Sequence, residues 1–343
     1  MGIARVAGVV VAGIAFLSRT AVARADTGYE GDDLSVRLAS AFVRFTDVST
    51  MGGETAANRW SPAINPASLA WTDHDDERRG VVLSAYGSRI SFDTGVRIDL
   101  LGESGLVDTR RYGTAHLALS QLRSNDRRDR NGLDFDYRTD TAQVQWGRRW
   151  GSFGGGATFN YASSEVTQSA AGIAMRHSTS DTYRTRVGAL YEPVCDWLIG
   201  AVGEYSWSPF RYDAQVPTPL GLLPVSGEDV QRQRIGRVGV SYEYREYCTL
   251  STDYQLDQVW NDRGTLTTHR WNVGVQHNVA QFLFLRAGAT IDAHGNAGFL
   301  AGVSAALGRS VVLEFGWQYD SLPELSPDFG RSNTLQLALS VRF

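Results

Sequence analysis

The last ten residues of the chain, 334–343, alternate between two kinds of side chain and end on an aromatic residue. Leucine, valine and phenylalanine occupy the odd positions, and the even positions are mostly polar. Successive side chains of a strand point to opposite faces, so one face of this segment is apolar and the other is polar. Such alternation, ended by Phe343, is typical of the closing strand of a bacterial outer-membrane β-barrel, with lipid outside and a polar lumen inside.

The N-terminus has the features of a secretory signal peptide. Arg5 precedes an apolar run over residues 6–17, and residues 23–25, Ala-Arg-Ala, match the small-x-small pattern of a signal-peptidase site. The run is roughly twelve residues long, which is too short to span a bilayer as a helix. We therefore predict a signal peptide over residues 1–25 and export from the cytoplasm.

Residues 80–343 read as strands joined by turns. No segment after the signal peptide has about twenty consecutive apolar residues, so only a closed barrel could span a membrane. About fourteen candidate strands follow, at 80–88, 90–101, 111–123, 135–148, 152–163, 182–192, 196–208, 232–244, 247–259, 267–278, 281–292, 297–307, 310–320 and 332–343. We predict an all-β fold, a 14-stranded antiparallel transmembrane β-barrel.

The lengths of the connections indicate how the barrel is oriented. Links after even-numbered strands are mostly tight, and the long links follow odd-numbered strands, at 124–134, 164–181, 209–231 and 321–331. In outer-membrane barrels short turns face the periplasm and long loops face outside. The pattern therefore predicts an even strand count with both ends of the barrel sequence at the periplasmic rim.

Aromatic and charged residues follow the same topology. Two aromatic girdles are expected, with Tyr191, Trp197, Tyr244, Tyr247 and Phe343 at the periplasmic rim and Tyr183, Trp207, Trp260, Trp271 and Tyr319 at the outer rim. Alternation assigns a set of polar side chains to the lumen, because a charge facing lipid costs a few kcal/mol. These are Arg184, Arg186, Glu204, Arg237, Glu243, Asp253, Asp257, Arg270, Arg286, Glu314, Gln318 and Arg342.

Residues 26–79 do not show period-two alternation, and they are too apolar for a free tail. We expect this segment to lie inside the barrel as an N-terminal hatch, or plug. It contains Asn65-Pro66-Ala67 shortly before the first strand. Pro66 fixes its own φ and biases Asn65 towards an extended or turn conformation, and the Asn amide can bond nearby backbone. A rigid turn of this kind would suit a hinge, and an ordinary turn is the alternative.

With this motif, the strand count, the loop pattern and the terminal Phe, the chain resembles the FadL family of outer-membrane transporters for long-chain fatty acids and other hydrophobic compounds, which includes toluene-type transporters. The resemblance covers nearly the whole mature chain. It implies passive uptake of a hydrophobic small molecule, gating by the plug, and lateral release through the wall near the third strand, where Gly113 is a candidate kink point. We expect a monomer in contact with outer-membrane lipid and lipopolysaccharide, without a cofactor.

In that family the third and fourth external loops collect the ligand, and here the two longest loops are 164–181 and 209–231. The resemblance nominates the apolar residues of these loops as ligand-entrance residues: Ile173, Met175, Leu220, Leu222, Leu223 and Val225. Exposed apolar patches mark binding surfaces. The alternative is that both loops fold over the barrel mouth and cover it.

The two cysteines, Cys195 and Cys248, fall at the periplasmic ends of strands. An exported protein can form a disulfide. The two positions lie about two strand spacings apart, near 10 Å, which exceeds normal bridging reach unless the turns lean together. A disulfide and two free thiols both remain open at this stage.

The sequence offers no constellation for catalysis or for metal binding. The six histidines show no metal-ligand spacing with the cysteines, and the net charge of −4 gives no argument for a nucleic-acid partner. We expect no enzymatic activity. The alternative to transport is a barrel that acts as a scaffold or as a secretion-associated protein that binds a partner.

Overall fold

The structure, a computed structural model of the full chain, describes residues 34–42, 55–59, 61–71, 80–109, 111–125, 127–219, 221–244, 247–262, 264–293, 295–308, 310–320, 322 and 325–343. The predicted signal peptide lies outside the described residues, as does the predicted boundary between plug and barrel at residue 79.

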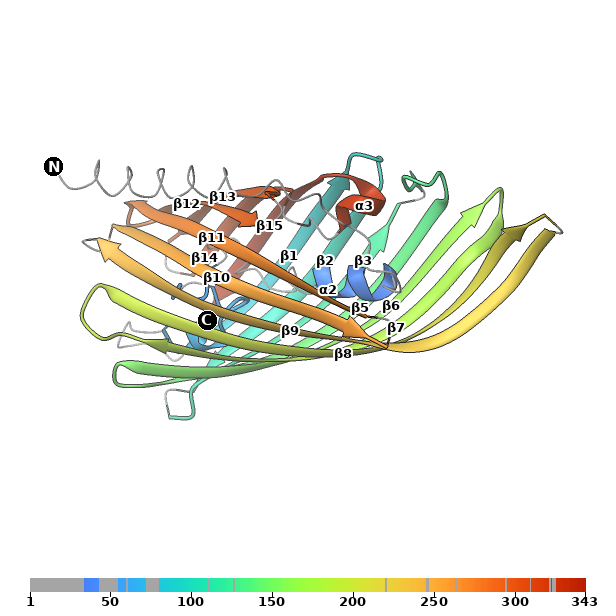
Figure 1. Cartoon of the computed structure of the whole chain (residues 1–343). Helices are drawn as coiled ribbons and strands as arrows, with labels where there is room; N and C mark the ends of the chain where they lie inside the picture. The colour runs from blue at the N-terminus through green and yellow to red at the C-terminus, as the bar shows by residue number, and fades with distance from the viewer. Residues whose placement is uncertain are drawn as a thin grey trace.

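The described chain forms one closed antiparallel barrel of fourteen long strands (Figure 1). The strands are β1 (Val81–Phe92), β2 (Arg97–Asp108), β3 (Thr114–Ser124), β5 (Asp134–Trp150), β6 (Phe153–Ala170), β7 (Ile173–Tyr191), β8 (Trp197–Thr218), β9 (Gly221–Tyr244), β10 (Cys248–Asn261), β11 (Gly264–Ala280), β12 (Leu283–Asp292), β13 (Ala297–Leu307), β14 (Val311–Tyr319) and β15 (Ser332–Arg342). A two-residue strand, β4 (Arg127–Arg128), pairs with the start of β5. Pairing of β3 with β5 and of β1 with β15 leaves no free edge. The predicted fold class is confirmed.

The closing strand behaves as its alternation predicts. β15 pairs with β1 along its whole length, from Ser332 opposite Phe92 to Arg342 opposite Val82. Leu337 is 60% exposed on the outer surface, whereas Gln336 is 3% exposed and faces the interior. The apolar face therefore points out of the barrel, as it does in barrels that span a membrane.

Both aromatic girdles lie on the outer surface. Eight of the ten predicted residues are exposed, and Trp260 and Tyr319 are half-buried. Near the outer rim, Tyr183 lies between Tyr161 and Trp207, with ring centroids 5.3 and 5.4 Å away. All twelve residues assigned to the lumen are buried or half-buried.

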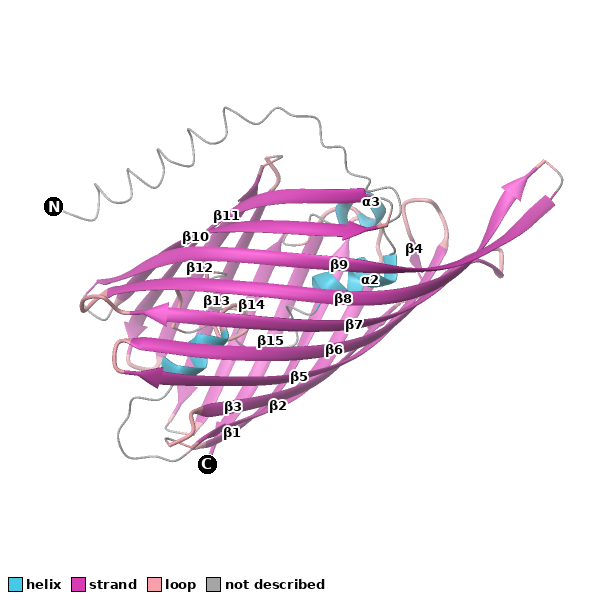
Figure 2. Ribbon diagram, turned by 60° about the horizontal axis from the view of Figure 1, so that its bottom comes forward, coloured by secondary structure: helices cyan, strands magenta, loops and turns pink. Residues whose placement is uncertain are grey.

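Two predictions about connections are wrong. The first strand does not end near residue 88 but continues to Phe92, and the turn falls at residues 93–96. Residues 164–181 and 209–231 are not loops; they are mostly strand, because β6, β7, β8 and β9 run far beyond the barrel rim. Figure 2 shows the hairpin of β8 and β9 projecting furthest.

The turn between β6 and β7 explains how so long a hairpin is made. Ala171 and Gly172 are its two central residues, with φ of 49° and 80°. Two successive positive φ values define the type I′ turn, whose twist matches that of paired strands. The pair therefore continues to the tip without a loop.

The described part of the N-terminal segment lies inside the barrel (Figure 2). Helix α2 (Leu34–Phe42) packs against β6, β7 and β8, and the 3-10 helix η3 (Pro66–Trp71) packs against β5, β6 and β7. α2 buries Leu34, Leu38 and Phe42, which recur every four residues and so share one helix face. Among the described residues, no helix is both long enough and apolar enough to cross a membrane.

Candidate functional site

Asn65 is the central polar residue of the plug and is fully buried. Its Nδ2 donates hydrogen bonds to the carbonyl oxygen of Ala56, at 2.7 Å, and to that of Ala189 in β7, at 3.1 Å. Its Oδ1 accepts a hydrogen bond from the backbone N–H of Ala67, at 3.0 Å. One amide thus shapes the Asn65-Pro66-Ala67 turn, joins it to an earlier plug segment and ties both to the barrel wall.

The wall opposite this turn lacks side chains. Gly147 of β5, Gly156 of β6 and Gly188 of β7 are direct cross-strand neighbours and form one row, which we term the glycine seat. A Cβ added at Gly147 would lie 2.8 Å from the Pro66 carbonyl oxygen, and Cβ atoms at Gly156 and Gly188 would overlap Pro66 and Asn65. The plug backbone can approach the wall this closely only because the three residues are glycine.

Arginines on the wall hold two further parts of the plug. Arg186 of β7 donates to the carbonyl oxygen of Ala63 and, through Nε, to Glu204 of β8 at 2.6 Å. Arg184 contacts the same carboxylate at 3.2 Å and donates to the carbonyl oxygen of Ser40 in α2, also at 3.2 Å. Glu204 therefore positions two guanidinium groups, each of which binds a plug carbonyl.

On the opposite side of the plug, β9 and β10 hold the segment around Ala56. The backbone N–H of Ala56 donates to Asp253 Oδ2 at 2.6 Å, and the Ser241 hydroxyl donates to the Ala57 carbonyl at 2.7 Å. Arg59 pairs with Glu192 at 2.6 Å near the periplasmic rim. The plug is thus bound by polar groups on several sides.

Apolar side chains gather in one part of the interior, beside α2. A buried cluster, which we term the apolar cluster, joins α2, the inner faces of β1, β2, β3, β5 and β6, and the segment before β15. Its members are Leu34, Leu38, Ala41, Phe42, Tyr86, Ile90, Phe92, Val96, Ile98, Leu100, Leu122, Phe135, Tyr137, Val166, Leu322, Leu325, Phe329 and Ala338. The last contributions come from the short helix α3 (Ser326–Phe329) and its flanks, at the outer end of the barrel.

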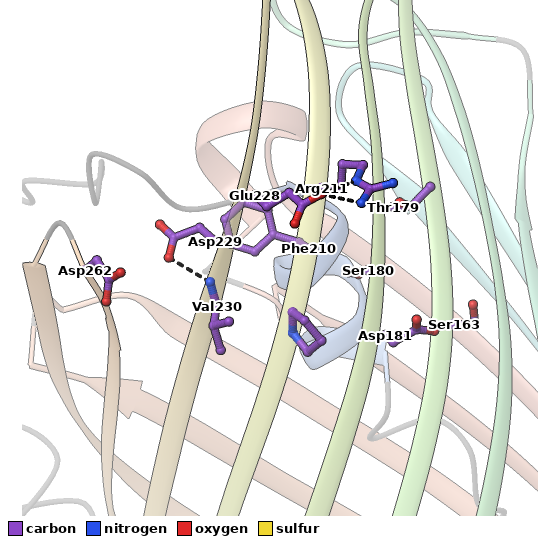
Figure 3. Close-up of a pocket in the computed structure, with 11 residues that line it drawn as sticks. Ser163, Thr179, Ser180, Asp181, Phe210, Arg211, Glu228, Asp229, Val230 and Asp262 are labelled. Carbon is purple, nitrogen blue, oxygen red and sulfur yellow. Dashed lines mark hydrogen bonds and ion pairs between the residues drawn. The ribbon is translucent and has the colours of Figure 1, made fainter.

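A polar pocket of about 560 Å³ lies in the wall of the hairpins β6 to β9 (Figure 3). We term it the wall pocket. Pairing of β7 with β8 is interrupted beside it, between Ser180–Phe210 and Tyr183–Trp207, at a position where Pro209 has no N–H to donate. Its lining includes four carboxylates and one arginine: Asp181, Glu228, Asp229, Asp262 and Arg211. Arg211 pairs with Glu228, so the remaining surface favours water over an apolar solute.

The predicted ligand-entrance residues lie at the tips of the hairpins. Ile173 and Leu223 are 53% and 54% exposed, Leu222 and Val225 are also exposed, and Met175 is half-buried. Leu220 lies outside the described residues. None of the described entrance residues belongs to the apolar cluster or lines the wall pocket, and none contacts Asn65. The predicted ligand entrance and the predicted hatch motif therefore lie in different parts of the molecule.

Two further predictions concern a disulfide between the cysteines and a kink at Gly113. Cys195 and Cys248 both carry free thiols. Gly113 is not a kink inside the third strand but belongs to the turn before β3, with φ of 94°. β3 keeps a continuous register with both neighbours, from Thr114 to Arg123 against β5. Across the described part of the chain, no group of His, Cys, Asp or Glu could hold a metal ion.

Several solved outer-membrane proteins have a fold similar to that of this chain. The toluene transporter TbuX of Ralstonia pickettii superposes with a TM-score of 0.54 at 13% identity, covering 86% of this chain and 95% of that one. A FadL homologue of Pseudomonas aeruginosa gives a TM-score of 0.51 at 13% identity, covering 87% and 98%. The chain has a FadL-like fold. The predicted resemblance to the FadL family is confirmed at this level.

A third neighbour with the FadL-like fold is the toluene transporter TodX of P. putida, with a TM-score of 0.53, 11% identity and coverage of 86% and 97%. These neighbours are described as transporters or as a FadL homologue, and at 11–13% identity the likeness concerns the fold. No family model and no curated protein matches the sequence.

Sequence reasoning missed the glycine seat and the outer segment around α3. Gly147, Gly156 and Gly188 are far apart in sequence, and only the strand register aligns them. A usable signal existed in the residues 154–156, three consecutive glycines within a strand, because strand glycines often mark a close backbone approach.

Proposed function

We propose that this chain is an outer-membrane channel for passive uptake of small hydrophobic molecules, closed at rest by its N-terminal plug. The observation that carries the proposal is the buried Asn65 amide, which joins the plug turn to β7 across the glycine seat. In this proposal the plug, held by these wall contacts, blocks free diffusion of solutes through the lumen. The FadL-like fold of hydrocarbon transporters supports the substrate class.

The proposal extends to place and surroundings. An apolar outer belt between two aromatic girdles fits a bacterial outer membrane, with outer-membrane lipid and lipopolysaccharide as neighbours and a monomer as the working unit. Lateral release through the wall, the further step implied by the family resemblance, would require hydrogen bonds of β3 to break, because its ladders with β2 and β5 are continuous.

Two measurements test the proposal. Cells without a transporter of this kind should take up labelled palmitate or toluene faster when they express the full chain. In planar bilayers the intact protein should show little steady conductance, and deletion of residues 26–79 behind the signal peptide should open it. A large steady current through the intact protein would exclude a closing plug.

Partner binding is the second candidate function. It is favoured by the projecting tip of β8 and β9, where Leu222, Leu223 and Val225 are exposed. A partner-binding barrel would co-purify with a protein, and the triple change of these residues to Ser would abolish that complex. Retention of a lipid or hydrocarbon by gently purified protein, seen by mass spectrometry, would favour transport instead.

A further inference from the structure

Leu322 and residues 325–330, which precede β15, cover one end of the apolar cluster. Phe329 of α3 is fully buried, with its ring centroid 5.1 Å from that of Phe92 and 4.9 Å from that of Phe135. Leu322 and Leu325 are also fully buried in the same cluster. We term residues 325–330 the outer lid. Its side chains occupy apolar space inside the barrel that an apolar solute could fill equally well.

Among the described residues, two backbone hydrogen bonds join the outer lid to connections between strands. The backbone N–H of Thr94 donates to the Phe329 carbonyl at 3.3 Å, and that of Arg130 donates to the Asp328 carbonyl at 3.0 Å. Both partners belong to connections between strands and not to a ladder. Displacing the lid therefore breaks no strand pairing of the barrel.

One contact links the outer lid directly to the plug. Arg37 of α2 pairs with Asp328 of the lid, N to O at 2.8 Å, with both side chains 20% exposed. α2 and α3 also share the apolar cluster, through Leu34, Leu38 and Phe42 on one side and Phe329 on the other. A movement of the lid therefore changes the packing of the plug helix.

The wall pocket is chemically unsuited to an apolar solute. The wall pocket carries four carboxylates, and the apolar residues at the hairpin tips do not line it. An apolar molecule that followed the hairpins down to this pocket would have to displace water from charged groups, which is costly.

We infer that a hydrophobic solute enters the barrel at the outer lid, by replacing Phe329 in the apolar cluster, and that it loosens the plug helix through α2. This inference rests on the proposed uptake function and names its entrance. It differs from the expectation that the third and fourth loops lead the ligand in. In this scheme the hairpin tips at most bind the solute outside the barrel, and displacement of the outer lid controls its entry into the lumen.

The first test fixes the lid by a disulfide. A Cβ at Gly330 would lie 2.7 Å from the Asp93 Cβ, so the pair Asp93→Cys and Gly330→Cys needs about 1 Å of movement to reach bonding geometry. Cys195→Ser and Cys248→Ser remove the native thiols. The protein oxidised with diamide is compared with the same protein reduced with dithiothreitol. Both forms carry Cys at position 330, so any strain from its positive φ is the same in the two forms.

With the lid fixed, cellular uptake of palmitate and of toluene should fall roughly ten-fold and recover on reduction, as expected where a lid limits the rate. Equal uptake by the oxidised and reduced forms would overturn the inference. If neither form nor the unmodified chain takes up either probe, the proposed function itself fails, and that outcome is recognisable because the unmodified chain is assayed beside them.

The second test compares two buried phenylalanines at the same end of the barrel. Phe329→Ala opens space in the apolar cluster, whereas Phe210→Ala changes a residue that lines the wall pocket. The inference expects uptake to change several-fold in Phe329→Ala and to stay near the unmodified rate in Phe210→Ala. The reverse result would place the entrance at the wall pocket. Outer-membrane level and heat-modifiable migration of both variants check that each barrel has assembled.

Discussion

The two ends of the barrel interior hold the plug by different means. Around Asn65 the contacts are hydrogen bonds to fixed backbone atoms, laid against glycines that allow no added side chain. Around α2 apolar packing between Phe42, Tyr137 and the outer lid dominates, with polar contacts from Arg184 and Arg37 beside it. Hydrogen bonds to the backbone require one geometry, whereas apolar packing tolerates rearrangement. The polar end thus specifies where the plug sits, and the apolar end is where its position can change.

The largest effect should come from a side chain placed in the glycine seat. Gly156→Val would overlap Pro66, and overpacking of about 1–3 kcal/mol would shift the plug equilibrium by roughly five-fold to a hundred-fold. We expect a clear rise in bilayer conductance. Gly236→Val is the matched control, because Gly236 lies in β9 with no atom within 4 Å of an added Cβ. Equal conductance of both variants would remove the seat from the explanation of closure.

Truncation at the apolar end should cost more packing free energy than the change in the glycine seat, but it should raise the conductance less, because it acts on α2 and not on the Asn65 turn. Phe42→Ala removes a fully buried ring from α2, and such changes cost about 3–5 kcal/mol in a well-packed core. Because apolar packing can adjust, we expect α2 to loosen while the Asn65 turn stays in place. Limited proteolysis should then cut near residues 34–42 and spare residues 61–71. Simultaneous cleavage of both segments would mean that the plug moves as one body.

Removal of the Asn65 amide should raise the conductance less than a side chain in the glycine seat, because it weakens the attachment of the turn without pushing the turn off the wall. Asn65→Ala leaves the buried carbonyl oxygen of Ala56 and the half-buried one of Ala189 without this donor, and a buried group left unsatisfied costs about 1–3 kcal/mol. Asn65→Asp keeps the acceptor for the Ala67 N–H but loses both donors. We expect both variants to show brief channel openings, with Asp no better than Ala. Rescue of closure by Asp would show that the turn alone matters.

The smallest effect belongs to the link between the two helices. Arg37 and Asp328 are partly exposed, and pairs of this kind contribute about 0–1 kcal/mol. A double-mutant cycle with Arg37→Ala and Asp328→Ala should give a coupling energy within that range in thermal unfolding of the plug. A coupling of zero would leave the apolar cluster as the connection between lid and plug.

Much of the barrel was predictable because apolar and polar side chains alternate along each strand, and this alternation indicates which side chains face outward and which face the lumen. Leu335 to Phe343, the lumen residues Arg186 and Glu204, and the aromatic Tyr183 and Trp207 all lie where alternation places them. The alternation is lost where the strands extend beyond the apolar belt of the barrel. Around Thr167 and His177 the side chains are polar on both sides, so the hairpin reads as a loop although it is a ladder.

The candidate site was predictable only in part. Asn65-Pro66-Ala67 was recognised as a rigid turn because Pro and Asn have strong local preferences. Its wall partners depend on strand register, which a single sequence does not contain. Phe329 lies in a helix of four residues, too short to show a helical period, so the segment reads as a surface loop. Contacts between distant segments were therefore the missing information.

The pairing of β1 with β15 also governs the order in which the protein must be assembled. Ser84 and Ser340, hydrogen-bonded across this seam, are 256 positions apart in the chain. Joining such distant segments carries the greatest loop-closure cost, so this ladder is expected to be the last to form. The plug precedes β1 in sequence and lies within the finished cylinder. We therefore expect the plug to enter while this seam is still open, so that formation of the last ladder also encloses the N-terminal segment.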